Sequence, residues 1–103
     1  MSSEMQYERV LLNEVDLQQA FRRLISIQEP EKCDMCGISL AEETLLVDGA
    51  LKPGPGWAFM CPACYATKGK GIGCGLGQVY MRQLGGRWLL VAGFCPEPSY
   101  EEE

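Results

Sequence analysis

Two short motifs decide the fold, Cys33-Asp34-Met35-Cys36 and Cys61-Pro62-Ala63-Cys64. In each motif the two cysteines are three positions apart, so a tight turn, or knuckle, can direct both sulfur atoms to one metal ion. The chain contains no histidine that could replace a thiolate. The motifs therefore predict one metal site with four cysteine ligands, Cys33, Cys36, Cys61 and Cys64.

Zinc is the ion that such a site favours, with one ion per chain. Four protein ligands leave no open coordination position, so the ion stabilises structure and does not catalyse. Metal binding is then coupled to folding. Gly37 suits the turn after the first pair, and Pro62 restricts the backbone of the second. We expect two knuckles, each on a β-turn, which is the layout of a zinc ribbon.

Other uses of the same cysteines are weaker interpretations. Iron binds four thiolates in rubredoxin, but the aromatic residues of a rubredoxin knuckle are missing from the first pair. A thioredoxin-type redox motif opens a helix after a strand, and we expect neither pair in that setting. Two structural disulfides require an oxidising compartment. A rubredoxin-like or thiol redox protein is therefore the third choice of function.

The length and the termini favour a small cytoplasmic domain. A chain of 103 residues has room for one domain, and a domain this small gains much from a metal. We find no apolar stretch of the roughly 18 residues that cross a bilayer, and no signal-peptide pattern at the start. Cytoplasmic thiols stay reduced, which again favours metal binding over disulfides.

Charge is distributed unevenly along the chain. The formal net charge is −5, which argues against avid non-specific binding to nucleic acid. Residues 49–96 nevertheless contain no Asp or Glu, and an acidic chain can still present one basic face. Ordinary solvated charges are the simpler interpretation. A nucleic-acid-contacting ribbon with a regulatory role is the alternative function, with candidate contacts at Lys68, Lys70, Arg82 and Arg87.

The N-terminal part predicts one amphipathic helix over residues 15–28. Asp16 can cap its first turn and Pro30 ends the pattern. Its apolar residues recur at helical spacing, and we expect this stripe to lie in the core. The stripe consists of Leu17, Ala20, Phe21, Leu24 and Ile25. Residues 1–5 read as a loose terminus, and residues 7–12 as a strand or the start of a helix.

Short strands are expected over residues 44–47 and 57–60, separated by a loop over 52–56. Gly85-Gly86 predicts a two-residue hairpin turn between strands at 78–83 and 88–92. That register sets Met81 opposite Leu90 and Gln83 opposite Trp88. Both faces of this hairpin are apolar, and one helix covers only one of them. A protein partner or a symmetric dimer is therefore expected to cover the other face.

Two features near the C-terminal end stay open. The run of alternating glycines over 69–77 lacks the ending of a P-loop and favours a tight connection packed on the ribbon. An anion nest beside Lys68 and Lys70 is the alternative. Cys74 and Cys95 are most simply small apolar side chains or incidental thiols. Extending the hairpin would bring them close, so a disulfide or a second metal pair is also open.

Together these patterns predict a small α+β domain with an N-terminal helix, a four-cysteine zinc ribbon and a C-terminal β-hairpin. The N-terminal segment spans 1–30, the ribbon with its hairpin spans 31–95, and a disordered acidic tail spans 96–103. Without histidine there is no Ser/His/Asp or Cys/His constellation, so we expect no enzyme and identify no small-molecule substrate. The expected function is a zinc-binding module that meets a protein partner.

Three further stretches form a recognisable pattern: Asp48-Gly49, Gly56-Trp57-Ala58-Phe59-Met60-Cys61-Pro62-Ala63-Cys64 and Gly71-Ile72-Gly73-Cys74-Gly75-Leu76-Gly77-Gln78-Val79-Tyr80. This pattern resembles small uncharacterised zinc-ribbon proteins of bacteria and their phages. The resemblance covers roughly residues 32–80 and departs at Cys74, where that group carries Thr or Leu. It implies a metal-binding fold and no established activity.

Overall fold

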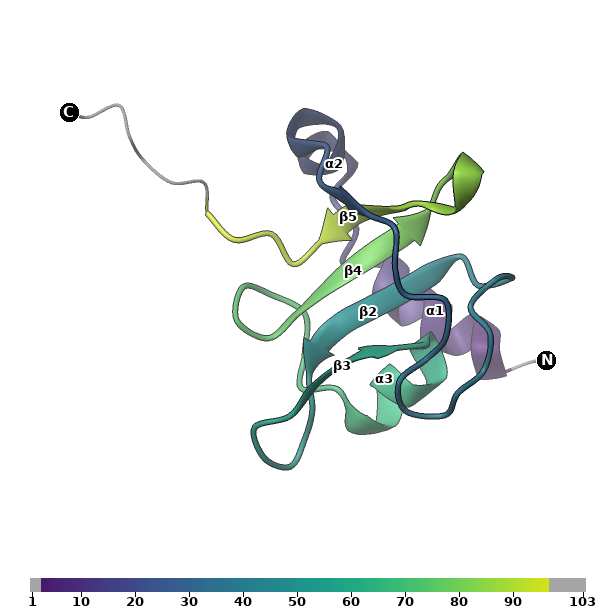
Figure 1. The fold of residues 1–103 in the computed structure, drawn as a ribbon. Coiled ribbons are helices and arrows are strands. Elements are labelled where there is room, and N and C mark those ends of the chain that lie inside the picture. The colour runs from purple at the N-terminus through teal and green to yellow at the C-terminus, as the bar shows by residue number, and fades with distance from the viewer. Residues whose placement is uncertain (1–2, 97–103) are drawn as a thin grey trace.

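A computed structural model describes residues 3–96 and shows a small α+β fold (Figure 1). One five-stranded antiparallel sheet has the order β1-β5-β4-β2-β3. Its strands are β1 (Ser26–Ile27), β2 (Leu45–Ala50), β3 (Trp57–Met60), β4 (Gly77–Arg82) and β5 (Trp88–Ala92). The helices are α1 (Ser3–Leu12), α2 (Leu17–Arg23), α3 (Pro62–Lys68) and the short 3-10 turn η1 (Leu84–Gly86).

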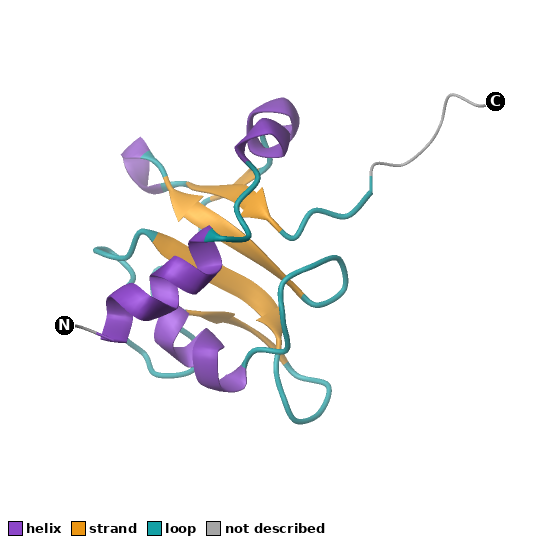
Figure 2. Ribbon diagram, turned by 180° about the vertical axis from the view of Figure 1, so that it is seen from behind, coloured by secondary structure: helices purple, strands orange, loops and turns teal. Residues whose placement is uncertain are grey.

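The first face of the sheet is covered by helices. Figure 2 shows α1 and α3 lying together across it. Leu11 of α1 is completely buried among side chains that alternate along the strands, including Val47, Val79 and Val91. An apolar side chain of this size that is removed from water contributes roughly 1.5–3 kcal/mol, so Leu11 anchors α1 on the sheet.

The second face is covered by the segment between β1 and β2, which crosses in front of the sheet in Figure 1. Its Leu40 packs with Leu46, Tyr80 and Trp88 in a second buried cluster. The indole N–H of Trp88 donates to the Pro30 carbonyl at 3.3 Å. The chain therefore covers both faces of the β4–β5 hairpin by itself, and the need for a partner on a bare hairpin face disappears.

The predicted helix over 15–28 is shorter in the structure. Asp16 caps α2 as expected, accepting from the Gln19 N–H at 3.1 Å. The helix ends at Arg23 because Leu24 adopts a left-handed conformation with φ of 51°, and the chain continues into β1 beside β5. The expectation that its stripe lies in the core was wrong except at Ala20. Phe21 is 63% exposed, because Leu11 of α1 already fills the core.

Other local expectations also change. Residues 3–5 were expected to be loose but belong to α1. This helix also includes residues 7–12, for which the sequence allowed either a strand or the start of a helix. Strand β2 runs past Asp48 and Gly49, where it was expected to stop. Gly49 pairs there with Gly77, and a Cβ on it would approach the Gly77 Cα to 3.0 Å. The predicted tail lies outside the described residues, apart from Pro96.

The hairpin register was wrong near its turn. The Gln83 N–H donates to the Arg87 carbonyl at 2.7 Å, so the connection has three residues, 84–86, and Arg82 faces Trp88. A β-bulge between Val79 and Tyr80 restores the predicted pairing of Val79 with Ala92. The shift by one residue moves side chains to the opposite face, which puts Trp88 in the second buried cluster.

Candidate metal centre

Four sulfur atoms converge where the knuckle segment meets the start of α3. The Sγ atoms of Cys33, Cys36, Cys61 and Cys64 all lie within 4.8 Å of one another. Those of Cys36 and Cys61 are 3.9 Å apart. A tetrahedral zinc with Zn–S bonds of about 2.3 Å separates its sulfurs by about 3.8 Å, so this donor set fits the ion. Among the described residues, no other group of three or more His, Cys, Asp or Glu side chains is close enough to share a metal.

The first pair forms the predicted knuckle. The Cys33 N–H donates to the Ile38 carbonyl, and the Gly37 N–H donates to the Cys33 carbonyl at 2.9 Å. Gly37 closes the turn with φ of 80°, a conformation that glycine adopts without steric cost. The Met35 N–H points at the Cys33 sulfur, 3.4 Å away. Such donors disperse the negative charge of a metal-bound thiolate.

The second pair does not lie on a β-turn as predicted. Cys61 is the N-cap of α3, Pro62 occupies the first turn and Cys64 follows within the helix. Pro is favoured there because its missing N–H has no partner in the first turn anyway. The pair therefore opens a helix directly after strand β3, the setting of a thioredoxin-type motif that we did not expect. Here, however, the second pair faces the sulfurs of the first pair.

Asp34 attaches the knuckle to the sheet, and the sequence analysis missed this role. β3 is an edge strand whose outer backbone groups need partners. The Asp34 N–H donates to the Phe59 carbonyl at 2.9 Å, and the Asp34 carboxylate accepts from the Phe59 N–H at 3.0 Å. The sequence offered one signal for this contact, an Asp within the turn between Cys33 and Cys36, because Asp side chains in turns commonly accept hydrogen bonds from backbone N–H groups.

Burial and hydrogen bonding make the four thiols unequal. Burial opposes ionisation of Cys33, but N–H donors of Cys36, Cys61 and Met35 outweigh it and lower its pKa to about 7. Burial raises the pKa of Cys61 and of Cys64. Cys36 is exposed at the outer edge of the cluster. A metal would therefore meet one thiol that ionises more readily than usual and two that ionise less readily.

The four basic candidates divide between the two ends of β4. Lys68 and Lys70 precede this strand, beside Lys52, whose N–H donates to the Lys68 carbonyl. Arg82 ends the strand, donates to the Glu43 carbonyl and stacks on the Trp88 ring at 4.5 Å. Arg87 donates to the Ser26 hydroxyl. Lys52 therefore lies beside the two predicted lysines, whereas Arg82 and Arg87 make contacts within the fold.

The glycine run forms a tight connection before β4, as favoured. The N–H groups of Gly73 and Gly77 are bonded to carbonyls of the same loop, which leaves fewer donors for an anion nest. The cysteine in this loop, Cys74, is joined to Cys95 by a disulfide with a Cα–Cα distance of 4.6 Å. Of the alternatives left open for these two residues, the structure shows the disulfide.

Comparison with known proteins gives no relative for this chain. No family description, curated protein or solved structure matches it. Within residues 3–96 no helix is both long and apolar enough to span a membrane. The interpretation of the chain therefore depends on its own geometry, above all on the four converging cysteines.

Proposed function

We propose that this protein is a zinc-binding structural module in which Cys33, Cys36, Cys61 and Cys64 hold one ion. The observation that carries the proposal is the convergence of four sulfurs from two segments separated by a β-hairpin. The chain runs from knuckle to hairpin to helix, and the second ligand pair lies at the start of that helix. This arrangement replaces the ribbon layout and keeps the predicted ligands.

The ion would join two segments that also meet in the second buried cluster. The knuckle contributes Cys33 to the second buried cluster, and α3 rests on the first face of the sheet. Binding one ion to both segments fixes the edge strand β3 between them. A cytoplasmic location and kinship with small zinc proteins of bacteria and phages belong to the same proposal.

Metal analysis of the purified protein tests this proposal. We expect about one zinc per chain and a colourless solution. Replacement by Co2+ should give the absorption of a tetrahedral thiolate site. Red protein containing iron would instead support rubredoxin-like electron transfer, and protein that takes up neither metal would end the proposal.

The proposed module also meets a protein partner, and a second copy of the chain is the simplest one. The hairpin faces are covered, but α2 and its C-cap expose large apolar side chains. Leu17, Phe21 and Leu24 are 49%, 63% and 66% exposed. Side chains this large and this close together favour a protein contact over water. Light scattering at micromolar concentration tests it, and a monomer mass with little binding of a hydrophobic dye would contradict it.

Nucleic-acid contact is the second candidate function. It is favoured by Lys52, Lys68 and Lys70, which adjacent backbone segments bring to one end of the sheet, where Trp57 is also exposed. Lysines beside an exposed aromatic ring are typical of single-strand binding. A titration with single- and double-stranded DNA and RNA at low salt tests it. Absence of binding would remove this candidate.

A further inference from the structure

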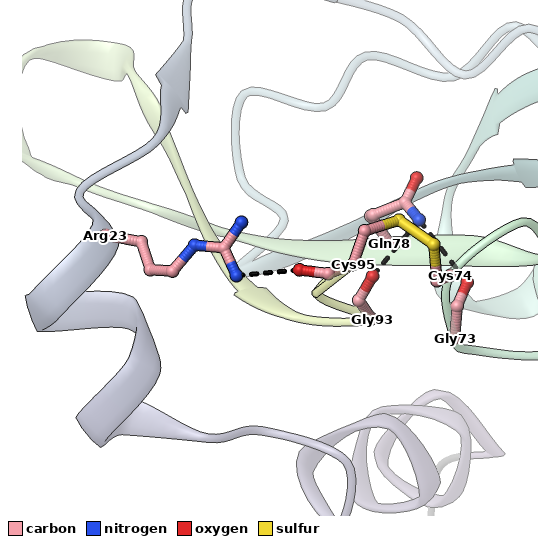
Figure 3. The surroundings of a disulfide bond; sticks show 6 residues. All are labelled: Arg23, Gly73, Cys74, Gln78, Gly93 and Cys95. Carbon is pink, nitrogen blue, oxygen red and sulfur yellow. Dashed lines mark hydrogen bonds between the residues drawn. A yellow bond between two sulfur atoms is a disulfide. The ribbon is translucent and has the colours of Figure 1, made fainter. Parts of the chain in front are cut away.

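The Cys74–Cys95 disulfide joins the glycine loop to the segment after β5 (Figure 3). Both residues are exposed. Cys74 has glycine on each side, and a Cβ added to Gly75 would meet nothing within 4 Å. Among the described residues, the Cys74 sulfur is therefore open to the approach of a small molecule.

The two segments that carry these cysteines are held together independently of the disulfide. The Gln78 side-chain amide donates to the Gly73 carbonyl at 3.4 Å and to the Gly93 carbonyl at 3.2 Å (Figure 3). Gly93 also lies so close to β4 that a Cβ on it would collide with the Gly77 carbonyl oxygen. The segments should therefore keep their positions when the disulfide is reduced, which leaves the two thiols within reach of each other.

Arg23 makes the surroundings of the two cysteines different. Its guanidinium donates to the Cys95 carbonyl at 2.8 Å and lies over the Phe94 ring at 5.3 Å. These contacts hold the backbone on the Cys95 side of the disulfide, whereas Cys74 lies in a loop between two glycines. Attack at the open Cys74 sulfur with departure of Cys95 is therefore the favoured direction.

We propose that Cys74–Cys95 is a thiol–disulfide exchange site for a low-molecular-weight thiol of the glutathione type. The thiolate of the small molecule attacks Cys74 Sγ, the S–S bond breaks, and Cys95 leaves as a thiolate. A second thiol attacks the mixed disulfide at its outer sulfur and releases Cys74. Two small thiols are oxidised to one disulfide, and the protein disulfide is reduced to two thiols. In the reverse direction Cys95 closes the bond again and expels the thiol from Cys74.

This site differs from the metal centre in its chemistry and does not depend on it. Cys33 and Cys61 are buried, and a bound metal would occupy all four ligand thiolates. Small thiols should therefore react first with the exposed pair. The site can exchange whether or not the other four cysteines hold zinc.

Equilibration of the full chain in reduced and oxidised glutathione tests the proposal. After an acid quench, alkylation and peptide mass spectrometry report each of the six cysteines, and metal content is measured in parallel. We expect Cys74 and Cys95 to pass from disulfide to free thiols as the reduced fraction rises, while the other four keep their state. A pair that stays oxidised at every ratio under native conditions overturns the proposal. Missing metal would count only against the zinc site.

Variants test the direction and the positioning. Cys95→Ser should accumulate one glutathione on Cys74, and the matched Cys74→Ser variant should form at least severalfold less adduct on Cys95. Equal adducts would overturn the assignment of Cys74 as the attacked sulfur. Gln78→Met keeps the side-chain length and removes both hydrogen bonds, so the disulfide should form less readily. Half of the pair should then be reduced at a ratio of reduced to oxidised glutathione that is about fivefold lower than for the wild type. No shift in a folded variant would exclude Gln78 as a positioning residue.

Discussion

The six cysteines form two regions with opposite surroundings. The four of the metal centre lie where a knuckle, an edge strand and a helix meet, with two of them buried. The other two join a glycine loop to the segment after β5 and are exposed. The contrast shows that the number of converging sulfurs and their burial decide the chemistry of a cysteine. Four converging sulfurs can complete a tetrahedral metal site, while the isolated pair forms a disulfide.

The two regions should also differ in their contribution to stability. Binding of structural zinc is worth roughly 10–16 kcal/mol in apparent free energy for small domains near neutral pH. A disulfide between residues 21 positions apart removes loop entropy worth about 3 kcal/mol, mainly from the unfolded chain. Breaking each region separately should make this difference visible.

Loss of a ligand should have the largest effect. Cys61→Ser or Cys36→Ser should abolish stable zinc binding and unfold the segment around the knuckle and α3, because folding and metal binding are coupled. Circular dichroism and thermal melting with and without a chelator measure this. A Cys61→Ser variant that melts like the wild type would show that the centre is not structural.

Acid should release the metal without affecting the disulfide. Burial raises the pKa of Cys61 and Cys64, so protons compete with the metal for these sulfurs as the pH falls. Stability contributed by the ion is therefore present at the higher pH and lost toward acid, by up to about tenfold in affinity per pH unit for each protonated thiol. A colorimetric zinc indicator in a pH titration follows the release. Unchanged affinity between about pH 8 and about pH 5 would contradict it.

Removal of the disulfide should be milder. The double variant Cys74→Ser with Cys95→Ser should retain its metal and lose at most about 3 kcal/mol of unfolding free energy. The loss should be smaller than this limit because Gln78 still holds the two segments together by its hydrogen bonds. Urea denaturation of oxidised wild type and variant gives the difference. Loss of zinc from this variant would mean that the two regions are linked.

The attachment of the knuckle is expected to contribute less again. Asp34→Ala removes the acceptor for the Phe59 N–H and should cost about 1 kcal/mol. Asp34→Asn keeps an acceptor oxygen and serves as the matched control. Chemical denaturation of both variants, each checked for zinc, measures the effect. Equal stability of the alanine variant and the wild type would show that the edge contact is dispensable.

The smallest effect on stability should come from α2. Phe21 is 63% exposed, so Phe21→Ser should change the free energy of unfolding by no more than about 0.5 kcal/mol. Self-association, where present, should decrease. Sedimentation and denaturation of the wild type and the variant separate the two quantities, and a large loss of stability would show that α2 packs more deeply than its exposure indicates.

Several predictions failed because neighbouring segments compete for the same core. The stripe of α2 has helical spacing, but α1 fills the place beside the sheet, and only Ala20 is buried. Cys61 and Cys64 follow a short strand both in the predicted ribbon and in the structure. Whether a turn or a helix comes next depends on Pro62 starting α3 and on the face of the sheet where α3 rests. The spacing of residues along the chain indicates neither which helix occupies the core nor where α3 packs.

The sequence by itself determined the four cysteines that converge, the loop before β3, the hairpin and the cap of α2. These depend on spacing between near neighbours or on local backbone preference, which the chain carries in its own residues. Only the tertiary structure decided the contact of Asp34 with β3, the one-residue shift of the hairpin and the pairing of Cys74 with Cys95. The first and the last join residues more than 20 positions apart, whose separation in space depends on how the whole sheet is arranged. The hairpin shift depends on which face of the sheet buries Trp88.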